Sequence, residues 1–267
     1  MEPMTEQRSQ APAQPSFGSQ RADLWLQILL VLGVSLGASA LWSLLDLAET
    51  LSTSSIAESK ASMNAPQSGF PLFDILRRSL GILLALVPPL LALYLLAGSA
   101  GQLRGLLHRI GLDRRAPLAD LGLGTLLFAV MGLGTLALYQ AGRQLGITAE
   151  IVTNAGGTSW WEVILLLASA VRHSLVEEII VVVFLADRLL RVGWTWPAVL
   201  IGSALLRGSY HLYQGLGGFV GNVVMGLLLG WVYTRTRRVM PLVIAHTLLD
   251  AVGFVGYPLL ARAGLLG

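Results

Sequence analysis

The chain has 267 residues, of which 54% are hydrophobic and only 12% are charged. This composition excludes an ordinary soluble globular domain and indicates an integral membrane protein. The absence of cysteine excludes disulfides, thiol nucleophiles and cysteine-ligated zinc. The formal net charge of +3 is spread over loops and gives no indication of nucleic-acid binding.

The order of polar and apolar segments predicts an all-α fold, a polytopic transmembrane helical bundle. Residues 1–23 are rich in Gln, Pro and Ser, so we expect a disordered cytoplasmic tail there. A helix needs about 20 apolar residues to cross a bilayer. Windows of about that length lie at 24–45, 79–98, 118–140, 160–184, 196–211, 218–234 and 239–253. A short apolar piece at 257–266 brings the predicted count to seven or eight spans.

The distribution of arginine predicts the orientation of these spans. Three arginine-rich loops, around 104–115, 188–191 and 235–238, alternate with loops that are nearly free of Lys and Arg. Loops rich in Lys and Arg stay on the cytoplasmic side of a membrane. We therefore expect a multi-pass protein of the cell membrane with its N-terminus in the cytoplasm.

Two adjacent carboxylates, Glu177 and Glu178, lie inside the apolar window 160–184. A charged side chain at the bilayer centre costs at least about 2.5 kcal/mol, so such a pair indicates a functional site that faces the protein interior. Two later windows carry polar pairs spaced by one helical turn. These are Arg207 with His211, and His246 with Asp250.

The residue types in this cluster favour one kind of chemistry. Hydrogen bonding between helices explains any one of these polar groups taken alone. It explains less well why three of the four histidines, His173, His211 and His246, fall in the same C-terminal region as the glutamate pair. Water-mediated amide hydrolysis needs a carboxylate base, an imidazole to share the proton and donors for the oxyanion. The sequence therefore indicates peptide-bond cleavage within the membrane.

The same residues resemble the motifs of the CPBP family, the CAAX protease and bacteriocin-processing group of intramembrane glutamic endopeptidases, also called Abi. That family has Glu-Glu-x3-Arg, Phe-x3-His and His-x3-Asn/Asp on three separate membrane helices. The counterparts here are 177–182, 207–211 and 246–250. We assign 157–267 as the CPBP-type catalytic transmembrane core and 24–156 as N-terminal transmembrane helices.

The resemblance implies a role for each matching residue. Glu177 is expected to activate the attacking water with help from His211. His246 and Asp250 are expected to help bind the oxyanion. An ionised carboxylate would repel an oxyanion, so Asp250 would have to be protonated, or hydrogen-bonded to His246 so that the imidazole is the donor. Glu178 is expected to pair with the motif arginine and to shape the site.

The chain departs from the family pattern at two positions. Val182 stands where the motif has arginine, and Arg207 stands where the second motif has phenylalanine. We expect these departures to compensate. Our hypothesis is that Arg207, one turn from His211, supplies from a neighbouring helix the guanidinium that neutralises Glu178.

The predicted function is an intramembrane endopeptidase whose substrates are membrane-associated peptides or proteins, with lipid modification left open. We expect no cofactor. Zinc held by Glu177, His211 and His246 is the alternative, although no His-Glu-x-x-His helix supports it. A catalytically silent scaffold or immunity protein is a second alternative, which the missing motif arginine favours. A proton-coupled transporter is a third, because buried Glu and His also form proton relays.

Overall fold

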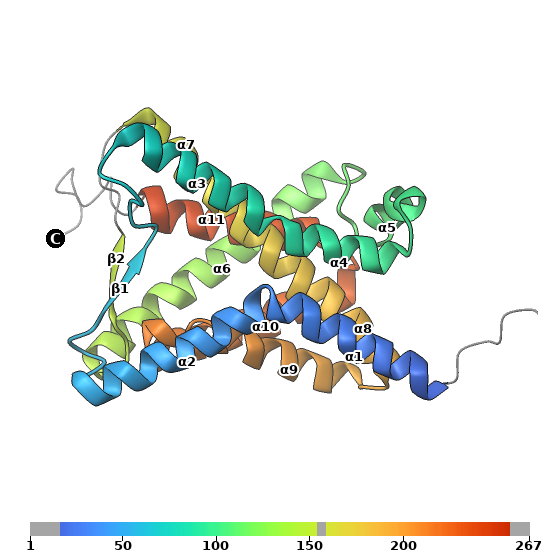
Figure 1. Ribbon diagram of the computed structural model, residues 1–267, viewed down its shortest axis with the longest axis horizontal. Helices are drawn as coiled ribbons and strands as arrows, with labels where there is room; N and C mark the ends of the chain where they lie inside the picture. The colour runs from blue at the N-terminus through green and yellow to red at the C-terminus, as the bar shows by residue number, and fades with distance from the viewer. Residues whose placement is uncertain (1–16, 154–158, 257–267) are drawn as a thin grey trace, which may run out of the picture.

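The computed structural model describes residues 17–153 and 159–256, and helices predominate in it (Figure 1). The first half comprises α1 (Phe17–Gly33), α2 (Leu36–Thr53), β1 (Lys60–Met63), α3 (Pro71–Ala85), α4 (Val87–Ala97), η1 (Ala100–Gln102), α5 (Leu103–Arg109), α6 (Pro117–Gln144) and β2 (Glu150–Thr153). The second half comprises α7 (Trp160–Glu177), η2 (Glu178–Phe184), α8 (Leu185–Val192), α9 (Trp196–Ser209), η3 (Leu212–Gln214), α10 (Leu216–Thr236), α11 (Met240–Ala251) and η4 (Val252–Gly256).

Apolar surface on these helices supports the membrane assignment. Three helical stretches in the described part of the chain are long and apolar enough to span a bilayer, namely Pro71–Ala97, Pro117–Gln144 and Leu216–Thr236. The pair α1 and α2 makes a fourth if it is counted as one bent span. Leucines on these stretches are widely exposed, as expected for a surface that faces lipid; Leu83 and Leu133 are 65% and 73% exposed. The all-α membrane bundle is therefore supported, whereas the count of seven or eight spans is not confirmed.

Several predicted segments differ from the structure. The window 24–45 is divided between α1 and α2, whose axes differ by 55°. The side chain of Ser35 at the bend donates a hydrogen bond to the Val31 carbonyl, a local contact that commonly bends helices. Helix α1 begins within the segment expected to be a disordered tail. Residues 1–16 and the short piece 257–266 lie outside the described residues.

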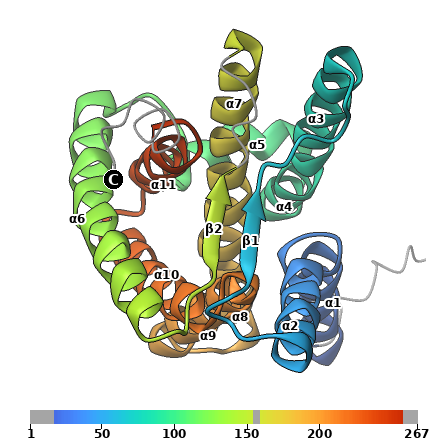
Figure 2. The same cartoon turned by 90° about the vertical axis from the view of Figure 1, so that its left-hand side faces the viewer.

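A two-stranded parallel sheet lies outside the predicted apolar windows. Strand β1 pairs with β2 in parallel, from Lys60 opposite Glu150 to Met63 opposite Thr153. Figure 2 shows the two strands side by side in front of α7. An antiparallel bridge between Thr148 and Gly215 ties this region to the segment that follows η3. The sheet is thus connected to the part of the chain that carries His211.

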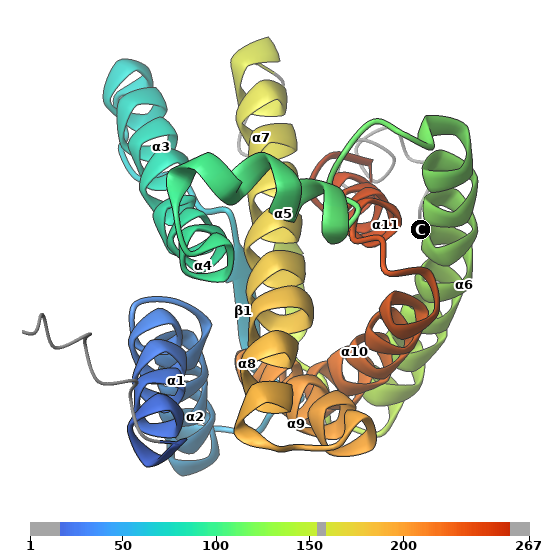
Figure 3. The ribbon, with the colours of Figure 1, turned by 90° about the vertical axis from the view of Figure 1, so that its right-hand side faces the viewer.

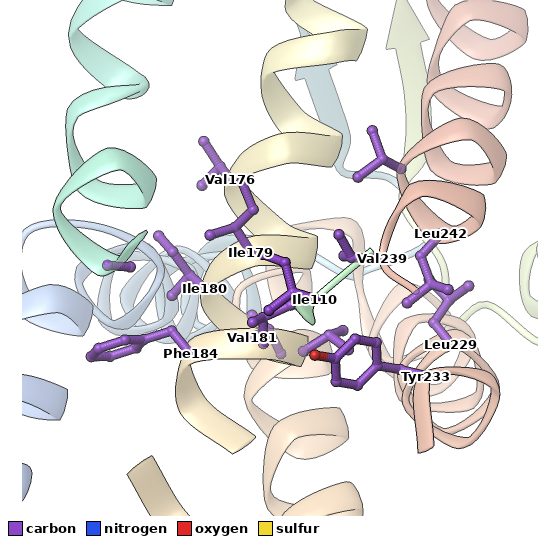
Figure 4. Close-up of a cluster of buried hydrophobic side chains, with 14 of the residues drawn as sticks. Ile110, Val176, Ile179, Ile180, Val181, Phe184, Leu229, Tyr233, Val239 and Leu242 are labelled. Carbon is purple, nitrogen blue, oxygen red and sulfur yellow. The ribbon is translucent and has the colours of Figure 1, made fainter. Parts of the chain in front are cut away.

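The hydrophobic core is built around η2, which is a π-helix. Every residue of η2 is buried. Figure 4 shows Ile180 and Val181 of this segment within a cluster that also contains Leu229 and Tyr233 of α10 and Leu242 of α11. Single π-helical turns interrupt α-helices most often at functional sites. This one begins at Glu178, the second carboxylate of the predicted site.

Candidate active site

The two glutamates lie at the junction between α7 and η2, in the interior of the bundle. Glu177 ends α7 and is 7% exposed, whereas Glu178 begins η2 and is fully buried. Carboxylates in such a position need partners, because an unpaired buried charge is strongly unfavourable. Arg207 of α9 lies close to both side chains, and each glutamate also has a partner of its own.

Glu178 is held by a cation and an imidazole that converge on one oxygen. Arg207 of α9 donates from Nη2 to Glu178 Oε1 at 2.5 Å. His246 of α11 contacts the same oxygen through Nδ1 at 2.8 Å. The predicted ion pair between Arg207 and Glu178 is therefore present in the structure. It links η2 to α9, and His246 adds α11 to the same network.

Arg207 can be fully buried because α9 and α10 approach closely at small residues. A Cβ atom on Gly226 of α10 would lie 3.0 Å from the Ala204 Cα and 3.3 Å from the Arg207 Cδ. Small residues on one helix face let two backbones come together in a membrane protein. The glycine-rich face of α10 thus provides the space that the guanidinium and its aliphatic chain occupy.

The departure at position 182 has a structural explanation. Val182 and Arg207 line one small cavity of about 10 Å³, together with Ser203 and Gly226. Side chains at positions 182 and 207 therefore border the same space in the protein. An arginine on η2 would compete for it with Arg207 of α9.

Glu177 is surrounded by donors from the end of α9. The Tyr210 hydroxyl donates to Glu177 Oε2 at 2.7 Å, and Arg207 Nη2 lies 3.7 Å from the same oxygen. The other oxygen, Oε1, lies 4.0 Å from Nε2 of His211. This last distance is too long for a direct hydrogen bond, so a hydrogen-bonded link between the two groups needs a water between them. Neither ring nitrogen of His211 has a hydrogen-bond partner among the residues that the structure describes, although both are buried.

The third motif lies on the opposite side of the glutamates. With Nδ1 of His246 directed at Glu178, its Nε2 lies 3.8 Å from Asp250 Oδ1. Asp250 Oδ2 lies 3.4 Å from Nδ1 of His173 on α7. A hydrogen bond of 2.7 Å between the hydroxyls of Ser174 and Thr247 joins α7 to α11 beside this contact. All four residues predicted to be catalytic, 177, 211, 246 and 250, therefore belong to one contiguous polar network.

Sequence reasoning missed one member of this network. Tyr210 contacts Glu177 directly, although its place beside His211 gave no reason to choose it over Tyr213. His173, one of the three histidines that the sequence placed in this cluster, lies one turn before Glu177 and pairs with Asp250. Arg172, its neighbour, interacts electrostatically with Asp250 and Glu177. Positive charge therefore borders the site on two sides.

No three His, Asp or Glu side chains are arranged to bind a metal ion in the parts of the chain that the structure describes. The zinc alternative needs Glu177, His211 and His246 as ligands. Of these, His246 would have to bind zinc through Nε2, because its Nδ1 contacts Glu178. Activity measured after chelation would test the expectation that the protein works without a cofactor.

Comparison with known proteins adds one match. The family model described as type II CAAX prenyl endopeptidase Rce1-like matches residues 159–252. No curated protein matches the chain. No solved structure matches it either. The matched region runs from the start of α7 to the start of η4 and contains all three motifs, so the resemblance predicted from the motifs is confirmed for this part of the chain.

Proposed function

Because residues 159–252 are similar to Rce1-like CAAX endopeptidases, we propose that the protein cleaves peptide bonds of membrane-associated peptides or proteins with a water activated by Glu177. The observation that carries the proposal is the position of Glu177 Oε1, which lies 4.0 Å from His211 Nε2 across two helices. A water between these atoms can give its proton to the carboxylate while it hydrogen-bonds to the imidazole.

The reaction assigns a separate task to each side chain. The water oxygen attacks the scissile carbonyl carbon, and Glu177 takes the proton. When the tetrahedral intermediate collapses, the C–N bond breaks and Glu177 returns the proton to the leaving amine. Tyr210 and Arg207 hold the second oxygen of Glu177, which keeps Oε1 directed toward His211. Arg207 also offsets one of the two negative charges.

His246 is the proposed donor to the oxyanion. Its Nδ1 is directed at Glu178, so only Nε2 is left to meet a substrate oxygen. A proton on both nitrogens makes the ring an imidazolium that lies between the carboxylates of Glu178 and Asp250. Asp250 thereby acts through His246 and not as a direct ligand of the oxyanion, which an ionised carboxylate would repel.

Comparative mass spectrometry of membrane-protein termini tests the proposal, in cells that carry wild type, Glu177→Gln or His211→Ala. We expect termini present with wild type to be missing with both variants. Glu162→Gln is the matched control, because Glu162 is a second buried glutamate of α7 and lies in its first turn, about four helical turns before Glu177. Identical termini in wild type and Glu177→Gln, with equal amounts of folded protein, would refute proteolysis and favour the scaffold alternative.

A further inference from the structure

A second polar feature lies away from the active site, at the start of α9 and the end of α10. His211 lies near the other ends of these two helices. There the first turn of α9 and the last turn of α10 enclose an open groove of about 390 Å³. Its walls combine two indole rings with two guanidinium groups; the lining residues are Trp196, Pro197, Leu200, Trp231, Thr234, Arg235 and Arg237. Figure 3 views the molecule from this side, where α9 and α10 lie next to each other.

The two arginines are fixed by the tryptophans. The guanidinium of Arg235 lies over the ring of Trp231 at 5.5 Å, and that of Arg237 lies over the ring of Trp196 at 4.8 Å. Cation–π contacts of this kind order a guanidinium while its N–H groups stay free to bind an anion. Neither arginine forms an ion pair with a carboxylate in the described part of the chain. Two ordered positive charges therefore face one groove.

The helix that forms the other wall adds positive potential. The N-terminus of an α-helix carries unpaired backbone N–H groups and the positive end of the helix dipole. The N-cap residue of α9, Thr195, makes no side-chain hydrogen bond to these groups. An anion in the groove would thus meet two guanidinium groups and the free N-terminal end of α9.

The backbone conformation at Arg237 places its side chain beside α9. This residue caps α10 with φ of 53°, in the left-handed region where glycine is favoured. This conformation directs the Arg237 side chain back over Trp196 of α9.

We propose that this groove binds the anionic head group of a phospholipid from the surrounding leaflet. Tryptophan side chains favour the membrane–water interface, and arginine at that depth attracts anionic lipid. A phosphate in the groove would be bound by Arg235 and Arg237, while the acyl chains would extend along the exposed apolar side of α10. The exposed rings and leucines there, Trp231 and Leu227, suit lipid contact. The site is separate from the glutamates and does not depend on the proposed protease activity.

Native mass spectrometry of the full-length protein in detergent tests the proposal with phosphatidylglycerol and phosphatidylcholine. We expect wild type to retain phosphatidylglycerol preferentially, and Arg235→Gln with Arg237→Gly to bind it at least about tenfold more weakly. Glycine relieves the left-handed backbone, so this variant should fold at least as well as wild type. The matched control is Arg104→Gln with Arg109→Gln, two exposed arginines of α5; it should keep wild-type retention.

Three results would overturn the proposal. They are equal retention of phosphatidylglycerol by the groove variant and wild type, equal retention of the two lipids by wild type, and full displacement of the lipid by millimolar inorganic phosphate. The last result would show a site for a soluble anion instead of a lipid head group.

Discussion

The ion pair between Arg207 and Glu178 gives the sharpest test of how the chain tolerates the missing motif arginine. Both side chains are fully buried, and their closest atoms lie 2.5 Å apart. Arg207→Met removes the charge and keeps much of the side-chain volume, whereas Glu178→Gln keeps the shape of its partner. Each single change leaves one buried charge without compensation, so each should destabilise the protein by about 3–5 kcal/mol.

The double variant removes both charges at once. Replacing a buried ion pair by groups of similar volume is often close to neutral. The amide oxygen of Gln at position 178 can still accept from His246 Nδ1, which now contacts Glu178 Oε1 at 2.8 Å. The double variant should therefore lose less free energy of unfolding than the two single variants lose together, and the difference should be about 2–5 kcal/mol.

The measurement is unfolding in mixed detergent micelles, monitored by tryptophan fluorescence for wild type, both single variants and the double variant. Activity measured on the same preparations should return only in part in the double variant, because Arg207 also lies 3.7 Å from Glu177. If the two single effects add within about 0.5 kcal/mol, the residues are energetically independent. The proposed compensation would then be wrong.

Four further predictions concern single elements of the structure. Val182→Arg alone should inactivate the protein, because positions 182 and 207 border one cavity. The double variant Val182→Arg with Arg207→Phe restores the family pattern and should recover activity in a peptidase assay. Tyr210→Phe removes the 2.7 Å hydrogen bond to the Glu177 carboxylate and should lower kcat about tenfold or more, from about 1.5–3 kcal/mol for a bond to a charged group. Gly226→Ala places a Cβ 3.0 Å from the Ala204 Cα and should lower the free energy of unfolding by about 1–3 kcal/mol. Asp113 lies in the loop before α6, where hydrogen bonds from Arg115 and Arg238 outweigh desolvation and lower its pKa to about 2. The contribution of Asp113 to stability should be complete above about pH 4 and fade as the pH falls toward 2. Asp113→Asn should abolish that part of the pH dependence of Tm.

Matched controls separate these effects from general damage. Tyr213→Phe also removes a hydroxyl beside His211, but the Tyr213 hydroxyl accepts from Gln214 and does not contact Glu177, so kcat should change little. A Cβ on Gly221, also on α10, meets its nearest neighbour at 3.9 Å, so Gly221→Ala should be tolerated. Equal losses of kcat in Tyr210→Phe and Tyr213→Phe would contradict the role of Tyr210. Equal losses of stability in Gly226→Ala and Gly221→Ala would contradict the role of Gly226. A Tm of Asp113→Asn that tracks wild type between pH 5 and 2 would contradict the lowered pKa.

The helical spacing of polar residues predicted much of the site. Pairs four apart on one helix face a common side, so the spacing alone placed Arg207 with His211 and His246 with Asp250. The arrangement of three helices around Glu178 confirmed that these pairs meet in one network. The two departures from the family motifs predicted the ion pair across helices, because a buried carboxylate needs a cation from some element of the bundle.

Other features depend on contacts distant in the sequence, so local patterns could not reveal them. The pairing of β1 with β2 joins two segments of four residues each that lie about 90 residues apart, and such short segments do not reveal their pairing partner. The π-helical geometry of η2 could not be predicted either, since nothing in a run of apolar residues distinguishes a π-turn from an α-turn. Tyr210 was missed because its role depends on the direction of its side chain at the end of α9.

The position of the arginine changes what the ion pair does. In the family pattern the cation lies on the same helix as the glutamates, so it can adjust their charge without fixing any other element. Here Arg207 lies on α9, one turn before His211, and its Nη2 contacts Glu178 at 2.5 Å and Glu177 at 3.7 Å. One guanidinium therefore balances charge and also connects α9, the helix that ends just before His211, to both glutamates. Charge removal at position 178 can restore the charge balance but not this connection, which is why stability should recover further than activity in the double variant.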